Sequence, residues 1–437
     1  MRDHLAPRTL TRATDFTGKL RLGGLPAGRE VFYRVTLEDA SFAGPRSTPL
    51  VGSFRTAPDD RRDVSFVWSG DLGGQGFGIN PAVGGYRIFA AMGALEPDFF
   101  LCSGDLVYAD DPLPRQIGLA DGRVWHNEVT EAKEKVAETL DEFRGQYAYN
   151  WHDGHLREFA RRVPSIVQWD DHEVRDNWYP GQVLTDDDRY SERAVDVLAA
   201  RGRRAFAEWT PIGTPRVYRR IPRGPLLDVF VLDLRTYRDP NGPGRYADPA
   251  RGLLGAEQRT WLKRELAAST ATWKVLAIDL PLGLVLNDDG EAIAQGEPGA
   301  PLGRELEFAE ILRFALASDI GGLVFLTADV HYAAAHHYDP TRAAIGDFAP
   351  FWEFVAGPLN AGSFGPNALD PTFGPEAVFT AASQRPGASP ADGHQYFGHV
   401  AVDGATEAMT VSLRDLDGRV LFAKTLAAVS GASRTAP

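Results

Sequence analysis

Hydrophobic and polar positions follow two patterns along this chain. Near the start, Val31, Tyr33, Val35 and Leu37 alternate with the residues between them, which is typical of a β-strand. Short strands are expected at 20–22, 31–37 and 51–56. From Val64 onward, short apolar runs alternate with amphipathic segments. This second pattern predicts an α/β fold, with largely parallel sheets covered by helices.

The apolar runs predict strands at 64–69, 98–103, 163–169, 226–232, 273–278 and 323–327. Hydrophobic residues at helical spacing predict helices at 86–95, 129–147, 155–162, 258–268 and 304–317. The segment 396–425 alternates again, which indicates antiparallel strands around a turn at Asp415. We therefore divide the chain into a β-module at 1–58 and a larger domain at 59–437. Three strands are few for an independent domain, so the module either docks on the larger domain or lacks its first part.

An aspartate follows five of the predicted strands; these residues are Asp71, Asp105, Asp171, Asp233 and Asp329. Taken alone, an Asp after a strand is more often a turn or helix N-cap residue. Because ligands of such folds bind at the carboxyl ends of the strands, we expect these side chains at the same edge of one sheet. Clustered carboxylates repel one another unless cations neutralise them. The repetition therefore indicates a metal site.

Composition narrows the chemistry of this site. The chain has 46 Lys and Arg against 59 Asp and Glu, a net charge of −13, so no nucleic-acid-binding surface is expected. The single cysteine excludes an internal disulfide and a cysteine-cluster metal site. The remaining oxygen and imidazole ligands suit Mn, Fe, Zn, Mg or Ca. Two such metals close together can clamp a phosphoryl group and generate a hydroxide nucleophile. The chain contains no run of about 18 apolar residues, so no transmembrane helix is predicted.

Four motifs resemble a known family. Gly104–Asp110, with Asp105 and Tyr108, resembles the second motif of calcineurin-like metallophosphoesterases, in the form seen in purple acid phosphatases and PhoD-type alkaline phosphatases. Trp169-Asp-Asp-His-Glu-Val174, followed by Asn177-Trp178, is close to the signature of the PhoD-like group. Ala328–Tyr332 and Leu232–Arg238 resemble two further motifs, and the strands at 20–58 resemble the end of the β-sandwich that precedes the PhoD catalytic domain. The resemblance covers nearly the whole chain.

The resemblance implies a fold of metallophosphoesterase-type β-sandwich sheets flanked by helices, preceded by a short, incomplete β-sandwich module. It also implies two or more metal ions: iron plus calcium, or Mn, Zn or Mg in place of either. The implied metal ligands are Asp71, Asp105, Tyr108, Asp171, Asp329 and His331, with Asp105 bridging two sites. His172 would act on the substrate, Arg235 would bind phosphate oxygens, and Asn177 and His336 are candidate substrate contacts. His336 could alternatively close a loop.

The sequence departs from this family at two ligand positions. PhoD enzymes commonly carry a Cys before a Gln in the first loop as an iron ligand, and here Gly74 precedes Gln75. The lone Cys102 lies inside a predicted strand, where a buried hydrophobic role is expected. A second-metal His is also absent, and Asp279 stands in that region as a possible substitute or an ordinary strand-end residue.

The resemblance implies metal-dependent hydrolysis of phosphate esters by a metal-activated hydroxide, with a small phosphomonoester or phosphodiester as substrate. Alternatives are a phosphodiesterase of lipid or polymer headgroups and a non-catalytic surface binding protein. The oligomeric state is not predicted. Relatives of this type are exported, so a periplasmic or extracellular location is expected by resemblance. The start of the chain shows no signal peptide, which favours the cytoplasm for the chain as it stands.

Overall fold

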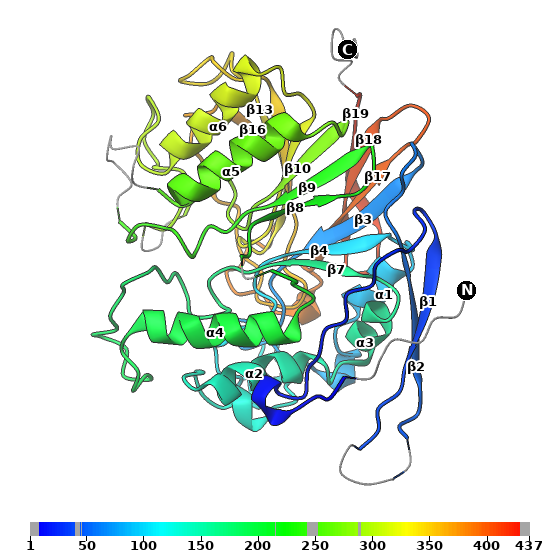
Figure 1. The fold of residues 1–437 in the computed structure, drawn as a ribbon. Coiled ribbons are helices and arrows are strands. Elements are labelled where there is room, and N and C mark those ends of the chain that lie inside the picture. Colours follow the sequence, from blue (N-terminus) through cyan, green and yellow to red (C-terminus); the bar gives the residue numbers. More distant parts are fainter. Residues whose placement is uncertain are drawn as a thin grey trace.

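Two β-sheets pack face to face, and helices cover the outer face of each (Figure 1). The computed structural model describes residues 8–39, 44, 46–214, 216–242, 252–286 and 290–428. This arrangement confirms the α/β class that the alternating pattern predicts. Among the described residues, no helix is both long and apolar enough to cross a bilayer.

Six of the described strands form the first sheet. Its order is β19 (Val420–Leu426), β18 (Met409–Asp415), β17 (Tyr396–Val402), β3 (Val64–Ser69), β4 (Phe99–Ser103) and β7 (Ser165–Gln168). The strands β3, β4 and β7 are parallel, whereas β17, β18 and β19 are antiparallel. Because β3 is buried on both faces, it reads as a nearly continuous apolar run.

Seven described strands form the second sheet. Its order is β16 (Pro375–Ala381), β13 (Ala333–Tyr338), β14 (Phe351–Val355), β12 (Leu323–Thr327), β10 (Trp273–Ala277), β9 (Leu227–Val231) and β8 (Arg219–Pro222). The central strands β9, β10, β12 and β14 are parallel. The strands β8, β13 and β16 pair antiparallel and complete the edges.

The core between the sheets includes Phe66 and Trp68 of the first sheet and Val229, Val275 and Leu326 of the second, all buried. On the outer face of the first sheet lie α1 (Ile88–Gly93), α2 (Leu140–Asn150), α3 (Gly154–Ala160) and α4 (Val195–Trp209). The outer face of the second sheet is covered by α5 (Gly255–Ala268) and α6 (Glu305–Ala317) (Figure 1).

The acidic strand ends belong to both sheets, so the expectation of one sheet edge is wrong. Asp71, Asp105 and Asp171 follow strands of the first sheet, whereas Asp233 and Asp329 follow strands of the second. Hydrogen bonds join the two sheets at these ends. Trp68 Nε1 donates to the carbonyl of Thr327 (3.2 Å), Gln168 Nε2 to Asp279 (2.9 Å), and Trp169 Nε1 to Asp233 (3.0 Å). The carboxyl ends therefore still meet, but across the sandwich.

Two further predictions need correction. The segment 129–147 is not one helix, because a 3₁₀ turn, η3 (Glu131–Lys133), precedes α2, which begins after Thr139. Thr139 and Glu142 form a capping box, a strong helix-start signal that the hydrophobic spacing masked. Residues 20–22 form no strand. The helix α4 was missed, although Val195, Leu198, Ala205 and Phe206 are buried at helical spacing.

Near the N-terminus, β1 (Glu30–Val35) and β2 (Leu50–Arg55) form an antiparallel pair. The pair contacts the end of α3, because Ser53 N–H and Tyr33 OH both donate to the carbonyl of Arg161, at 3.0 and 3.1 Å. The β1–β2 pair is therefore hydrogen-bonded to the part of the chain that carries α3.

Candidate metal centre

The loops that follow β3, β4, β7 and β12 carry the candidate ligands. Six residues of these loops adopt a positive φ that is rare for residues other than glycine: Asp71, Gln75, Asp105, Asn177, Asp329 and His331. Each such residue costs about 1–3 kcal/mol, and such strain persists where the surrounding structure holds the backbone in place. The concentration of strain at these loops is typical of a functional site.

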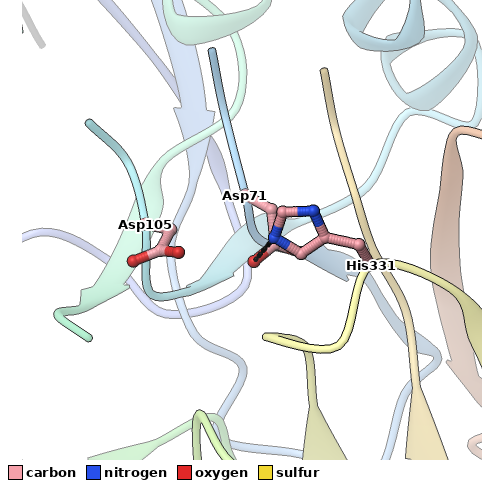
Figure 2. Close-up of side chains that lie close together, drawn as sticks. All are labelled: Asp71, Asp105 and His331. Carbon is pink, nitrogen blue, oxygen red and sulfur yellow. Dashed lines mark ion pairs between the residues drawn. The ribbon is translucent and has the colours of Figure 1, made fainter. Parts of the chain in front are cut away.

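Asp71, Asp105 and His331 form a first group of potential ligands (Figure 2). Each offers one ligand atom, and these atoms lie within 4.8 Å of one another. His331 Nε2 is 3.6 Å from Asp71 Oδ1 and 2.9 Å from the hydroxyl oxygen of Tyr108. All four side chains are buried. The structure thus brings together four of the residues that the motifs single out.

The environment of His331 keeps its imidazole neutral and oriented. Nδ1 lies 2.6 Å from the carbonyl oxygen of Gly362. Because a carbonyl only accepts, Nδ1 carries the hydrogen, and the lone pair of Nε2 faces Tyr108 and Asp71. Burial lowers the pKa of His331 to about 4. A neutral imidazole held by a carbonyl on its other nitrogen is the form that binds metals.

Asp71 is fully buried, and neither carboxylate oxygen has a hydrogen-bond partner among the described residues. Burial, followed by the negative charge of Asp170, raises its pKa well above the usual value. Such a group is costly unless a cation or a proton satisfies it. The carboxylates, phenol and imidazole here form a donor set that fits a metal ion.

A second group of potential ligands contains Asp105, Asp171 and His172. Asp105 therefore belongs to both groups, as a bridging carboxylate does. Asp171 accepts the backbone N–H groups of His172 (2.8 Å) and Asn177 (2.6 Å). Burial alone would raise the pKa of Asp171, but the charges of His172 and Arg235 and these two hydrogen bonds lower it. Asp171 is thus an ionised, oriented ligand candidate.

His172 is held by Asp110, whose Oδ1 lies 2.7 Å from Nδ1. Burial alone would lower the pKa of His172, but Asp110, Asp171 and Asp105 outweigh it and raise the pKa well above the usual value. The Tyr108 ring packs against the imidazole, with centroids 4.1 Å apart. His172 is therefore an oriented imidazole that favours its protonated form.

The ligand loops surround a pocket of about 340 Å³. Six of the predicted site residues line it: Asp105, Asp171, His172, Asn177, Asp329 and His331. Asp71 and Tyr108 lie behind this surface, in contact with His331. Asn177 also donates its side-chain amide, in the orientation that its partners require, to both oxygens of Glu291 (2.6 Å each) and to Asp171 (3.3 Å).

Arg235 does not line the pocket. Its side chain is fully buried, and its guanidinium contacts Asp170 (2.5 Å), Glu291 (2.5 Å) and, more distantly, Asp279 (3.7 Å) and Asp171 (3.8 Å). These four carboxylates occupy the fork that was expected to bind phosphate. The structure therefore corrects the expected role: Arg235 neutralises the carboxylates behind the pocket.

His336 also lies away from the pocket. It sits in β13, is 2% exposed, and its Nδ1 is 2.9 Å from Glu353 Oε2. Glu353 also accepts hydrogen bonds from Tyr338 OH and the backbone of Leu282. The expected substrate contact of His336 is thus replaced by an internal hydrogen-bond network, because β13 turns this side chain into the fold.

Sequence reasoning missed three acidic residues of the site. Asp110 orients His172, and Glu291 lines the pocket against Asn177. Glu173 accepts backbone N–H groups of Asp105, Leu106 and Asp170, and so joins the loops after β4 and β7. Asp110 and Glu173 lie inside the motifs at 104–110 and 169–174, so the sequence could have identified them as site residues. Glu291 comes from a long loop without a recognisable pattern.

Gly74 has no space for a side chain. A Cβ atom there would lie 2.4 Å from the Tyr108 ring, well inside contact distance. The space that a side chain at position 74 would take is therefore filled by the tyrosine ring. Cys102 is buried in β4, consistent with its expected packing role.

The fold is metallophosphoesterase-like. The sequence model of the PhoD-like phosphatases matches residues 66–413. The chain therefore belongs to the PhoD-like phosphatase family, and the predicted resemblance is confirmed. This family consists of phosphoric ester hydrolases.

Individual relatives agree with this assignment. Alkaline phosphatase D of Bacillus subtilis (strain 168) is 29% identical over 250 residues, which are 52% of this chain and 41% of that protein. A solved structure of PhoD matches 93% of this chain and 83% of its own, with 19% identity and a TM-score of 0.62. The purple acid phosphatase PPD1 from yellow lupin (Lupinus luteus) seeds matches 92% of this chain and 60% of its own, with 14% identity and a TM-score of 0.56. The two structures support the fold.

Proposed function

We propose that this protein hydrolyses phosphate esters, with phosphomonoesters as the main substrates, at a centre of two or more metal ions. The observation that carries the proposal is the position of Asp105, which lines the pocket and belongs to both groups of potential ligands. Membership of the PhoD-like phosphatases supports the same activity. Metal ions at such a centre lower the pKa of a water molecule and offset the charge of the phosphate.

The two metal positions that we propose differ in their donor atoms, and His172 of the second group is assigned to the substrate instead of the metal. Asp71, Asp105, Tyr108 and His331 combine carboxylate, phenol and neutral imidazole, which suits iron. Asp105, Asp171, Asp329 and Asn177 offer oxygen atoms to the second position, which suits calcium, magnesium or manganese. We assign these residues as the ligands of the two ions.

His172 then acts on the leaving group. Hydrolysis forms a bond from the oxygen of water to phosphorus, breaks the bond from phosphorus to the ester oxygen, and leaves an alkoxide that needs a proton. His172 lines the pocket, and Asp110 binds its Nδ1. Nε2 is therefore the nitrogen available to donate that proton. Arg235 acts indirectly, by balancing the charge of the carboxylates behind Asp171.

A phosphodiesterase is the second candidate. Among the described residues, no Lys or Arg lines the pocket, so the metal ions and His172 are the cations that face the substrate. A diester with one negative charge needs less compensation from them than a monoester with two.

The test is the turnover of p-nitrophenyl phosphate and bis-p-nitrophenyl phosphate by purified protein whose metal content has been measured. The variants are Asp105→Ala and His172→Ala, and the controls are Asp347→Ala and His126→Ala, which replace exposed residues of the same types. We expect the first pair to lose at least about 100-fold in kcat and the controls to stay near wild type. Unchanged turnover in both site variants would refute the assignment. Faster hydrolysis of p-nitrophenyl phosphate would identify a monoesterase, and faster hydrolysis of bis-p-nitrophenyl phosphate would identify a diesterase.

A further inference from the structure

Lys133 is a buried cation that the proposed chemistry does not use. It is the last residue of η3 and is 2% exposed. Its ammonium donates to the carbonyl oxygen of Tyr108 (2.9 Å) and to Oε1 of Gln146 (2.8 Å). An ammonium group is costly to bury, and an apolar side chain would fill the same space at a lower cost. What the lysine adds is therefore a donor to the backbone of a candidate metal ligand.

The segment 108–110 contacts both imidazoles of the site. The hydroxyl oxygen of Tyr108 lies 2.9 Å from His331 Nε2, and the Tyr108 ring packs on His172. The N–H of Ala109 donates to the carbonyl of His172 (2.8 Å), and Asp110 Oδ1 lies 2.7 Å from His172 Nδ1. The position of this segment therefore decides where the phenol and the Asp110 carboxylate meet the two imidazoles.

Each carbonyl of the segment 108–110 accepts a hydrogen bond from another part of the chain. The Lys133 ammonium donates to the first carbonyl, the N–H of Ala137 to the second (2.7 Å) and the guanidinium of Arg189 to the third (3.1 Å). Arg189 is exposed, whereas Lys133 is the buried side chain among these donors. Without its ammonium, the buried carbonyl of Tyr108 would have no donor among the described residues. The segment could relieve that cost only by moving.

Neighbouring contacts hold Lys133 itself in place. Gln146 of α2 accepts from the ammonium and donates through Nε2 to the carbonyl of Ala132 (2.6 Å). The backbone N–H of Leu113 donates to the carbonyl of Lys133 (2.8 Å). A continuous series of hydrogen bonds thus leads from α2 through Lys133 to Tyr108.

We infer that Lys133 is a positioning residue of the metal centre, which holds the segment 108–110 so that Tyr108 meets His331 and Asp110 meets His172. The inference rests on the proposed function. Lys133 does not line the pocket, so it acts through the segment 108–110 and does not contact the substrate. Hydrogen bonds that orient metal ligands from behind are commonly worth about 10–100-fold in metal affinity or activity.

The first measurement follows Tyr108 directly and needs neither metal nor activity. The protein is produced with 3-fluorotyrosine, and the ¹⁹F NMR signals of Tyr108 and Tyr338 are assigned with the variants Tyr108→Phe and Tyr338→Phe. Tyr338 is the internal reference, because it is buried in β13 of the other sheet and donates to Glu353. In Lys133→Met we expect the Tyr108 signal to shift by more than its line width and the Tyr338 signal to keep its position.

The second measurement is the turnover of p-nitrophenyl phosphate. We expect Lys133→Met to lower kcat by about 10–100-fold and to change KM by less than about twofold, because the groups that face the substrate are all retained. Lys135→Met, which removes an exposed lysine two residues away, is the matched control and should change neither kcat nor the Tyr108 signal. A Lys133→Met variant that keeps the wild-type kcat, or that loses it while the Tyr108 signal stays in place, overturns the inference.

Gln146→Met keeps the inference testable if Lys133→Met does not fold. It removes one of the two acceptors that hold the ammonium and leaves the lysine present. We expect the Tyr108 signal to shift and kcat to fall by about 3–10-fold. If both stay at their wild-type values in Gln146→Met, the inference is overturned.

The two measurements separate this inference from the proposed function. If the wild type does not hydrolyse p-nitrophenyl phosphate with any added metal, the proposed function fails, and the ¹⁹F signals still decide whether Lys133 positions Tyr108. If the wild type hydrolyses the ester and Lys133→Met does so equally well, only the inference about Lys133 fails.

Discussion

Asp110 Oδ1 lies 2.7 Å from His172 Nδ1, and this contact joins the loop after β4 to the loop after β7. The other oxygen of Asp110 accepts the backbone N–H of Asp176. With Tyr108 packed on its face, the imidazole of His172 has one orientation, with Nε2 toward the pocket. Asp110 is therefore a positioning residue for the proposed proton donor.

Replacing Asp110 with Asn should change the pH dependence of the reaction. Asp110 helps to raise the pKa of His172, so the protonated donor persists to higher pH, and activity falls as the pH rises through that pKa. In Asp110→Asn the pKa of His172 falls, so the alkaline limb of the kcat profile moves to lower pH. We also expect kcat to fall by about 10–100-fold. A variant with an unshifted alkaline limb contradicts this role.

Replacing Asp105 should reduce the amount of bound metal per chain more than replacing Asp171. Asp105 belongs to both ligand groups, whereas Asp171 belongs to one. After dialysis against buffer of defined metal content, we expect Asp105→Ala to lose ions from both positions and Asp171→Ala to keep one. The measurement is metal per chain by elemental analysis, with Asp347→Ala as the control. Equal loss in the two variants argues against a bridging role.

A side chain at Gly74 should disturb Tyr108. The backbone of Gly74 is not in the left-handed region, so the effect is steric: the new Cβ would lie 2.4 Å from the Tyr108 ring. We expect both Gly74→Ala and Gly74→Cys to lower the free energy of unfolding by about 1–3 kcal/mol. Urea unfolding measures the change. Gly154→Ala, at the start of α3 with nothing within 4 Å of the new Cβ, should be neutral or stabilising.

Arg235→Met should destabilise the fold. The substitution leaves buried carboxylates of Asp170, Asp279 and Glu291 without their cation, a loss of about 3–5 kcal/mol in the free energy of unfolding. Urea unfolding checks this, and Arg264→Met, at an exposed ion pair with Glu265, should change stability by less than about 1 kcal/mol. If Arg235→Met instead raises KM and leaves stability intact, Arg235 contacts the phosphate after all.

Lys133 should give stability an alkaline pH dependence. It is buried, and its ammonium donates to the carbonyl of Tyr108 (2.9 Å) and to Gln146 (2.8 Å). Burial lowers its pKa from 10.5 to about 8. The unfolded chain therefore binds more protons than the folded one between pH 8 and 10.5, so stability rises with pH in this window.

The comparison of wild type with Lys133→Met isolates this effect. Relative to the variant, the wild-type free energy of unfolding should increase by about 3 kcal/mol from pH 8 to pH 10.5. Denaturant unfolding at several pH values measures the difference. A difference that is independent of pH would show that Lys133 titrates normally in the folded protein.

The strands of the core could be predicted because a buried strand consists almost entirely of consecutive apolar residues. The predicted strand 64–69 coincides with β3, and 323–327 coincides with β12, since both are buried apolar runs. The helix predicted at 129–147 was too long because a turn with hydrophobic residues has the same local spacing. The local spacing of hydrophobic residues indicates which residues are buried, but it does not indicate where the backbone turns.

The amino-acid sequence by itself determined the α/β class, the family and the residues that are candidate ligands, because aspartates at strand ends and the Asp-His-Glu motif at 171–173 are local patterns. Only the tertiary structure decided which side chains meet. Arg235 and His336 turn into the fold, where Asp170 and Glu353 satisfy them, while Asp110, Glu173 and Glu291 join the site. The reason is that a motif specifies residue types, whereas the packing of two sheets specifies the direction in which each side chain points.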